Sequence, residues 1–228
     1  MQLVEAIESR RSVRAFLPDP VSQETVREIL RLASRSPSGT NMQPWKVYAV
    51  GGAVRQGIAD DVAAARERAR ETGVEEHVSE HRFYPPDMRD PYRARRREIG
   101  WGLYGLLDIT KGDREKAFAQ HGRNYTFFDA PVGLFVFIDK HLEIGSWLDL
   151  GMLMQTIMLV AREYDLHTCP QAAWPPYHRI VRKWTGAGED EELVAGIALG
   201  HEDTRAIENT LRTTRAPLEE ITSFAGFE

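Results

Sequence analysis

A continuous apolar run from Pro131 to Ile138 is the feature that most restricts how this chain can fold. The run does not alternate with polar residues, and a pattern of this kind is typical of a strand that is buried on both faces. Leu193 to Leu199 has the same character and indicates a second such strand. The sequence therefore predicts a sheet whose central strands are closed off from solvent on both faces.

Helical and strand patterns around these runs indicate the rest of the fold. Helices and strands are mixed without a regular βαβ alternation, so we expect an α+β fold. Helices are predicted at residues 2–9, from the cap Ser22 to about Ser36, and at residues 53–76, 92–109 and 145–165. Strands are predicted at Trp45–Val50 and, at the end of the chain, Ile221–Phe227, with a loop or lid from His77 to Pro91.

The predicted helix at residues 145–165 is apolar on more than one side. Leu150, Leu153 and Ile157 share one face, while Met152 and Leu159 lie on the opposite one. A helix that is hydrophobic all round is normally buried. We therefore expect this helix to be a central, buried element of the fold.

Composition excludes several classes of protein. A net charge of −5 argues against a general binder of nucleic acid or of anionic membranes. Cys169 is the only cysteine, so an intramolecular disulfide and a multi-cysteine metal site are excluded. The amino terminus lacks the apolar core of a signal peptide, and the run at Ala130–Ile138 is too short to cross a bilayer as a helix. We expect a soluble, cytoplasmic protein.

Two short segments near the amino terminus carry the groups best suited to bind a ligand. Arg10, Arg11, Ser12 and Arg14 place three guanidinium groups and a hydroxyl within five residues, and helical spacing would put Arg10 and Arg14 on one face. Guanidinium groups form strong hydrogen bonds to phosphate. The segment Pro37–Trp45 adds a flexible turn with polar side chains and amides. Alone, the first segment fits a solvated basic turn and the second an ordinary loop; together they indicate a phosphorylated, planar cofactor.

Five blocks of the sequence resemble the FMN-dependent nitroreductases, of the nitrobenzoate-reductase type. Their order and spacing extend over almost the whole chain, and only residues 53–125 lack a recognisable motif. The blocks are Arg10–Phe16, Ala33–Trp45, Cys169–Ala173, Gly196–Gly200 and Arg215–Glu220.

The resemblance implies a fold and an assembly. It implies one FMN-binding domain over residues 1–228, with a mixed, mostly antiparallel sheet flanked by helices. It also implies an intertwined homodimer with two FMN sites at its interface, in which a carboxy-terminal segment joins the partner's sheet. Residues from about 75 to 125 would be the variable region that covers the substrate.

The resemblance also assigns residues to the FMN site. The arginine cluster and Arg215 would contact the phosphate and ribityl groups, and the Pro37–Thr40 turn would approach the same flavin from the other subunit. Pro170–Ala173 would lie along the ring and offer a backbone amide to N5. The expected set is Arg10, Arg11, Ser12, Arg14, Pro37, Ser38, Gly39, Thr40, Asn41, Gln43, Asn124, Pro170, Gln171, Ala172, Ala173 and Arg215.

The implied activity is an oxidoreductase with a ping-pong mechanism. NADH or NADPH would give hydride to flavin N5 and leave, and a nitroaromatic or similar small aromatic acceptor would then take the electrons. An N–H donor at N5 and positive charge near the pyrimidine end stabilise reduced flavin, so no catalytic side chain is expected. The motifs do not indicate the physiological acceptor or the preference between NADH and NADPH.

Three further patterns each have a functional and a structural interpretation. His77 and His81, with Glu80 between them, could share a helical face, but a solvated face is favoured over a metal site because no further ligand is evident. Cys169 is expected to be a small buried thiol beside the cofactor rather than a nucleophile. The basic run Arg93, Arg95, Arg96 and Arg97 is favoured as a solvated face, with one hypothesis attached. If it lies at the mouth of the active site, it would favour an anionic substrate such as a nitrobenzoate.

Two alternatives to a nitroreductase remain open. Iodotyrosine deiodinase-like enzymes share the Pro37–Trp45 type of loop, but they hold their substrate partly through a lysine, and this chain has none between Lys116 and Lys140. A flavin-destroying relative that makes dimethylbenzimidazole carries Asp where this chain has Ser12, which argues against that activity here. A non-enzymatic flavin-binding dimer is the alternative from another class, and no partner-binding tail or DNA-reading module supports it.

Overall fold

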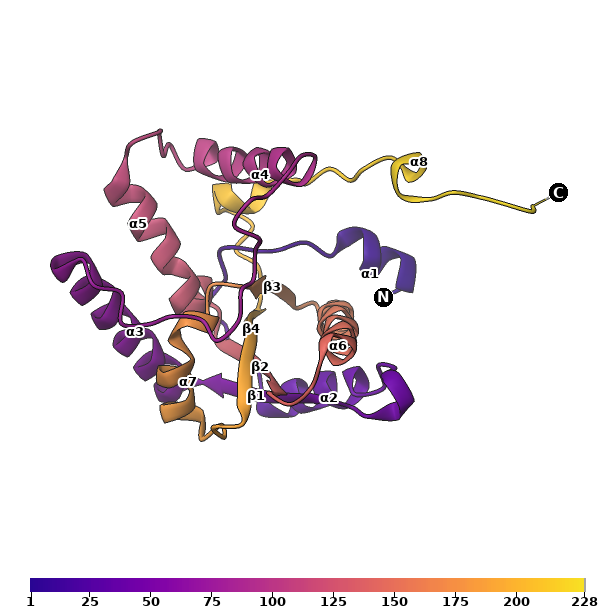
Figure 1. Cartoon of the computed structure of the whole chain (residues 1–228), viewed down its shortest axis with the longest axis horizontal. Helices are drawn as coiled ribbons and strands as arrows, with labels where there is room; N and C mark the ends of the chain where they lie inside the picture. Colours follow the sequence, from indigo (N-terminus) through magenta and orange to yellow (C-terminus); the bar gives the residue numbers. More distant parts are fainter. Residues whose placement is uncertain (228) are drawn as a thin grey trace.

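Four strands form the sheet at the centre of the computed structural model, which describes residues 1–227. The strands lie in the order β1-β2-β4-β3, and every neighbouring pair is antiparallel (Figure 1). Their bounds are β1 Trp45–Gly51, β2 Val132–Asp139, β3 His167–Gln171 and β4 Glu191–Gly200.

The two central strands are the ones that the apolar runs predict. In β2 every residue from Val132 to Ile138 is buried, and β4 is almost entirely buried as well. The two strands pair from Val132 opposite Leu199 to Asp139 opposite Glu191, with one shift of register between Val136 and Phe137. The predicted centre of the sheet is therefore confirmed.

Helices cover both faces of this sheet. Aliphatic side chains of α2 and α6 pack against one face, and α3, α7 and the turn η2 (Arg123–Asp129) pack an aromatic-rich cluster against the other. Figure 1 shows these two layers on opposite sides of the strands, with α4 beyond one end of the sheet. The helices are α1 Leu3–Ser9, α2 Gln23–Ala33, α3 Gly52–Thr72, α4 Tyr92–Leu106, α5 Arg114–Gly122, α6 Ile144–Glu163, α7 His178–Thr185 and α8 Leu218–Ile221.

Helix α6 is only half buried, so the expectation of a helix enclosed on all sides is wrong for the single chain. Its inner face packs on the sheet through residues such as Leu153 and Ile157. On its outer face Ile144, Leu148 and Met152 remain 79%, 69% and 38% exposed. Within residues 1–227, α6 alone is long and apolar enough to qualify as a membrane span. Its packing on the sheet accounts for the apolar residues of its inner face.

The carboxy-terminal segment also differs from the expectation. The predicted strand Ile221–Phe227 is wrong for the single chain, because residues 218–221 form the short helix α8 and no strand follows it up to residue 227. A strand needs a neighbouring edge to hydrogen-bond with, and this segment extends away from the body of the protein (Figure 1). Its large apolar side chains Ile221, Phe224 and Phe227 are at least 70% exposed.

Strand β3 and helices α5 and α7 are not evident from sequence periodicity. Strand β3 contains Pro170, which lacks an N–H and therefore suits an edge strand. Helix α7 buries His178 and Arg182, so its inward face is polar as well as apolar. Short elements of this kind depend on tertiary contacts that local patterns do not report.

Gly196 provides a test of the packing in the centre of the sheet. A methyl group at this position would overlap the ring of Trp174, which is fully buried and stacks on Phe127 at 4.6 Å between ring centroids. We expect Gly196→Ala to lower the free energy of unfolding by about 1–3 kcal/mol, because overpacking forces neighbouring side chains apart. Urea denaturation would measure this loss.

The matched control is Gly105→Ala on α4, where nothing lies within 4 Å of the added methyl group. This change should be neutral or stabilising by up to about 1 kcal/mol, as expected for glycine to alanine in a helix. Equal stability of the two variants would contradict the packing described around Trp174.

Candidate active site

The arginine cluster lies on the free edge of strand β3. Helix α1 ends at Ser9, and Arg10 already has an extended backbone. Ser12 forms a parallel bridge with Thr168, and the amide of Val13 donates to the carbonyl of Thr168 at 3.1 Å. The expected helical geometry of this cluster is therefore wrong. In extended chain successive side chains alternate, so Val13 enters the core and its neighbours on the chain point elsewhere.

A cavity of about 520 Å³ lies over this cluster. Four of its lining residues, Arg10, Arg14, Arg212 and Arg215, have no carboxylate partner within residues 1–227. Arg215 is contributed by the carboxy-terminal segment, as expected, and donates only to Thr213 and Thr214. The other lining groups are Ile7, Glu8, Ser9, Arg11, Ser12, Leu211 and Thr213, so Glu8 is the one carboxylate in the lining.

The electrostatics of the cavity favour an anion. Burial and the neighbouring Arg215 guanidinium both lower the pKa of Arg10 below its ordinary value. Such a shift means that the positive charge of Arg10 is unfavourable where the protein places it. An anion within the cavity would relieve that cost by forming charge-assisted hydrogen bonds.

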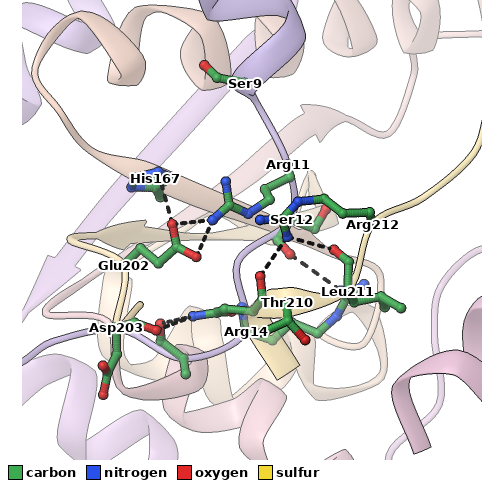
Figure 2. A network of polar contacts seen from close by, with 12 residues as sticks. Ser9, Arg11, Ser12, Arg14, His167, Glu202, Asp203, Thr210, Leu211 and Arg212 are labelled. Atoms are coloured by element: carbon green, nitrogen blue, oxygen red, sulfur yellow. Dashed lines mark hydrogen bonds and ion pairs between the residues drawn. The ribbon is translucent and has the colours of Figure 1, made fainter. Parts of the chain in front are cut away.

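Arg11 differs from the other arginines of the cluster because an acidic side chain of the same chain already binds it. Its Nη2 donates to both oxygens of Glu202, whose side chain is only 5% exposed (Figure 2). His167 of β3 lies on the same carboxylate, with Nε2 3.3 Å from Oε2. The Nε of Arg11 is buried and has no partner within residues 1–227. Arg11 therefore offers a directed N–H to a ligand rather than an uncompensated charge.

His167 stays neutral in this network. Burial, and then the positive charges of Arg162 and Arg11, lower the pKa of His167 to about 4. At neutral pH the carboxylate of Glu202 therefore compensates Arg11 alone.

Asn209 joins the cluster to the carboxy-terminal segment. Its Oδ1 accepts from the backbone amide of Arg14 at 2.8 Å, and its Nδ2 donates to the carbonyl of Ala15 at 2.8 Å. Arg212 in turn donates to the carbonyl of Asn209 at 2.8 Å. These bonds hold segments about 195 residues apart in the sequence on the two sides of one cavity.

The other end of β3 carries the predicted Pro170–Ala173 block. Gln171 ends the strand, and Ala172 and Ala173 form a turn that is partly exposed. No acceptor in the described part of the chain pairs with the amide of Ala173. This turn can therefore donate a backbone N–H to a ligand.

The buried side chain of Gln171 is bound within the protein, chiefly to the backbone carbonyl of Asn124. Nε2 of Gln171 donates to the carbonyl of Asn124 at 2.7 Å and lies 3.3 Å from its Oδ1. Oε1 of Gln171 accepts from the indole N–H of Trp174 at 3.2 Å. Gln171 is 2% exposed. In this chain the Gln171 side chain fixes the position of the Ala172–Ala173 turn, which its sequence context does not indicate.

The Pro37–Thr40 turn is held at another part of the molecule, against helix α6. The amide of Gly39 lies 3.2 Å from both carboxylate oxygens of Asp149, and Ser38 Oγ accepts from the amide of Gln43 at 2.9 Å. Thr40, Asn41 and Gln43 have left-handed φ angles of 48°, 59° and 51°. Non-glycine residues adopt such angles rarely, and clusters of them occur at functional sites.

Within one chain the turn and the arginine cluster lie at different points along α6. The turn is bound at Asp149, whereas Arg162, near the end of the helix, contacts Ser9 and His167 beside the cluster. Thirteen residues of helix separate these two anchors, which is a rise of roughly 20 Å. The predicted site residues therefore form two groups, one at the edge of β3 and one near the start of α6.

Two minor sequence expectations can now be compared with the structure. Cys169 is 3% exposed, and burial raises the pKa of its thiol to about 11, which fits the expected inert, buried thiol. His77 and His81 do not share a helical face, because residues 77–81 are not helical. His81 pairs with Glu192 at 2.8 Å, and His77 packs on Tyr177.

The structure adds functional residues that the sequence analysis missed. Arg212 supplies a fifth arginine to the lining of the cavity, and its spacing from Arg215 is a second basic pair that the sequence shows. Glu202, Asn209 and Asp149 act on residues more than 100 positions away, and no local pattern marks them.

Comparison with known proteins agrees with this geometry. The model of the Nitroreductase family matches residues 7–201. The chain is 35% identical over 222 residues to 4-nitrobenzoate reductase from Pseudomonas putida, an alignment that covers 97% of this chain and 95% of that protein.

Solved structures give the same result. The fold is similar to that of the FMN and NADPH-dependent nitroreductase NfnB from Sphigopyxis sp. strain HMH, with a TM-score of 0.94, 37% identity and complete coverage of both chains. It is also similar to NfnB from Mycobacterium smegmatis, solved in complex with NADPH, with a TM-score of 0.91, 31% identity and coverage of 98% and 97%. The expected α+β fold is thereby confirmed, and the chain belongs to the Nitroreductase family.

Proposed function

We propose that this protein is an FMN-dependent oxidoreductase that uses NADH or NADPH to reduce nitroaromatic or similar small aromatic acceptors. The observation that carries the proposal is the cavity at the edge of β3, where four guanidinium groups converge without a carboxylate partner in residues 1–227. Arg10 and Arg14 are half-buried and Arg212 and Arg215 are exposed, and an anion relieves the repulsion between like charges that lie this close together. The phosphate of FMN supplies one.

The residues along β3 fit FMN from its phosphate to its ring. Ser12 is paired with Thr168 at the cavity, and Gln171 ends the strand at the turn with the free amide. Roughly 10 Å of extended chain separates Thr168 from Gln171. On this assignment Arg10 and Arg14 hold the phosphate, the unpartnered Nε of Arg11 donates to the cofactor, and the Ala172–Ala173 turn meets the ring.

FMN, when bound, supplies the exchange of a hydride first with the nicotinamide and then with the acceptor. The chain supplies position and electrostatics. On this assignment the amide of Ala173 would donate to flavin N5, and its turn is held in place by the buried Gln171 side chain. No acid or base from the protein is assigned a role in the reaction.

The relatives support the choice of reductant and acceptor. NfnB from Mycobacterium smegmatis was solved with NADPH, and the Pseudomonas putida relative is a 4-nitrobenzoate reductase. Reductive dehalogenation and a non-enzymatic flavin carrier are not favoured by any feature of the described residues. Reduction of an aromatic acceptor by a nicotinamide, through a bound FMN, is the function that the geometry supports best.

We further propose that the protein is a homodimer, because several apolar surfaces have no partner in the single chain. Ile144, Leu148 and Met152 form an exposed stripe at helical spacing on α6. Leu3, Val4 and Ile7 of α1, which packs beside α6, are exposed as well. Contiguous exposed apolar surface of this kind marks protein–protein interfaces. The extended carboxy-terminal segment adds Phe224 and Phe227 for contact with a partner.

A two-fold dimer through α6 would complete the flavin site. In an isologous interface the same face of both subunits is used, so two copies of α6 that cross antiparallel bring the beginning of one against the end of the other. The Gly39 turn of one subunit, bound at Asp149, would then approach the arginine cluster of its partner, beside Arg162. This geometry supports the expectation that each FMN is shared between subunits.

The activity is tested with the purified full-length protein under anaerobic conditions. We expect a yellow protein whose flavin absorbance is bleached by NADH or NADPH and restored by a nitroarene such as nitrobenzene. Stopped-flow absorbance measures both steps separately. A protein that binds flavin but is not bleached by either nicotinamide would instead be a flavin carrier.

The phosphate cavity is tested by comparing FMN with riboflavin, which lacks the phosphate. Arg10→Ala should weaken FMN binding by about tenfold or more, because it removes a charge-assisted hydrogen bond. Riboflavin binding should not change. Fluorescence titration of the full-length protein with each flavin measures the two dissociation constants.

Arg205→Ala serves as the control for this comparison, because its exposed guanidinium is paired with Asp203 and does not line the cavity. It should leave the preference for FMN over riboflavin unchanged. If Arg10→Ala weakens both flavins equally, the phosphate does not lie in this cavity.

The dimer is tested by Leu148→Lys, which places a charge in the centre of the apolar stripe. We expect the dissociation constant of the dimer to rise by about thirtyfold or more, as for loss of an interface hot spot. Sedimentation velocity measures the dissociation, and FMN should be released as dimers separate. Val54→Lys, a change at an exposed apolar residue of α3, is the control and should stay dimeric. Monomers that retain FMN would contradict the shared site.

A further inference from the structure

A second cavity, of about 590 Å³, lies between helix α4 and the residues that precede it. Its size falls within the ~300–1,000 Å³ range of small-molecule sites. Arg93, Arg97, Trp101 and Tyr104 line it, and their spacing of three or four residues puts them on one face of α4. The cavity contains none of the residues that the flavin site uses.

The charges in this cavity favour an anionic ligand. Arg93 is compensated by Asp90, with Nη2 2.9 Å from the carboxylate. Arg96 lies over the ring of Tyr84 at 4.6 Å, and neither Arg96 nor Arg97 has a carboxylate partner within residues 1–227. Asp87 is the one acidic residue in the lining. Two uncompensated guanidinium groups therefore face the space.

The same cavity offers aromatic surface. Trp101 is 53% exposed, although a tryptophan normally buries most of its ring, and no residue of α4 is buried. Indole and phenol rings stack on planar ligands, and Tyr104 lies on the same face. The cationic and aromatic groups together match a planar ring that carries an anionic group.

Arg95, the remaining arginine of the basic run, points away from this cavity. Its Nη2 lies 2.7 Å from Glu220 of the carboxy-terminal segment, and it is absent from the lining. The basic run thus divides into arginines that face the cavity and one that attaches α4 to the tail. Arg95 is therefore a matched control of equal charge on the same helix.

We propose that the α4 cavity binds the anionic, planar end of this enzyme's own ligands and so determines which ligands it prefers. The proposal rests on the proposed function, because the ligand is either the carboxylated ring of an aromatic acceptor or the adenosine 2′-phosphate of NADPH. Both present a planar ring and an anionic group, and Arg96, Arg97 and Trp101 would recognise either.

Two pairs of ligands distinguish these sources. The first pair is 4-nitrobenzoate and nitrobenzene at fixed NADH, and the second is NADPH and NADH at fixed nitrobenzene. In the double variant Arg96→Ala/Arg97→Ala we expect kcat/KM for the anionic member of one pair to fall by about tenfold. This fall should result from a higher KM with kcat unchanged, and Trp101→Ala should lower kcat/KM for the same ligand. Flavin content, measured from the visible absorbance, should stay equal to that of the unmodified protein.

Each outcome has a defined meaning. A selective loss with nitrobenzoate assigns the cavity to the acceptor, and a selective loss with NADPH assigns it to the reductant; both support the proposal. If the ratio of kcat/KM values is unchanged in both pairs, the proposal is overturned. This result is expected if a second copy of the chain fills the cavity. An equal loss in Arg95→Ala also overturns it, because the effect would then be one of overall charge.

Direct binding separates this proposal from the proposed function. Isothermal titration of the holoprotein with benzoate and with adenosine 2′,5′-bisphosphate measures occupancy without turnover. Binding that the double variant loses supports the cavity even if no nitroarene is reduced. If nitrobenzene is reduced but neither probe binds, the proposed function stands and the cavity assignment falls.

Discussion

Burial of β2 and β4 on both faces is the constraint on which the rest of this structure depends. Two strands with no polar face must be covered by helices on each side, and α6 with α2, and α3 with α7, provide these layers. The sheet can then be extended only at its edges. Strand β3, with Pro170, forms one edge, and the segment around Ser12 pairs with it. The arginine cluster therefore reaches its position because the sheet has an open edge there.

The arginines at this edge differ in whether a carboxylate of the chain compensates their charge. Arg11 is compensated by Glu202 and oriented by it, so its cost to the folded chain is small. Arg10 and Arg215 are close, alike in charge and uncompensated, which destabilises the protein without an anion. A ligand that binds only the folded state restores that stability in proportion to its affinity. The cavity is thus a site whose ligand also stabilises the fold.

The exposed apolar surfaces of the single chain agree with the proposed dimer. Helix α6 presents one face to the core and another, with Leu148 at its centre, to solvent. The turn at Gly39 and the arginine cluster are each well held but lie roughly 20 Å apart along α6. The proposed interface between two such faces would explain both observations at once, because it would cover the stripe and bring the two groups together.

The sequence by itself determined the elements whose signals are local. The apolar runs of β2 and β4, the periodicity of α6, the basic cluster Arg10–Arg14 and the polar turn after Pro37 follow from composition and spacing within a few residues, and the structure contains all of them. The inference from these segments to a flavin rests on the family resemblance.

Only the tertiary structure decided which of these groups act together. Glu202 compensates Arg11 across 191 positions, and Asp149 holds Gly39 across 110. The direction of Arg95, away from the cavity that Arg97 lines, depends on its contact with Glu220. Long-range pairs of this kind leave no periodicity in the sequence, because the two groups come into contact only when the chain has folded.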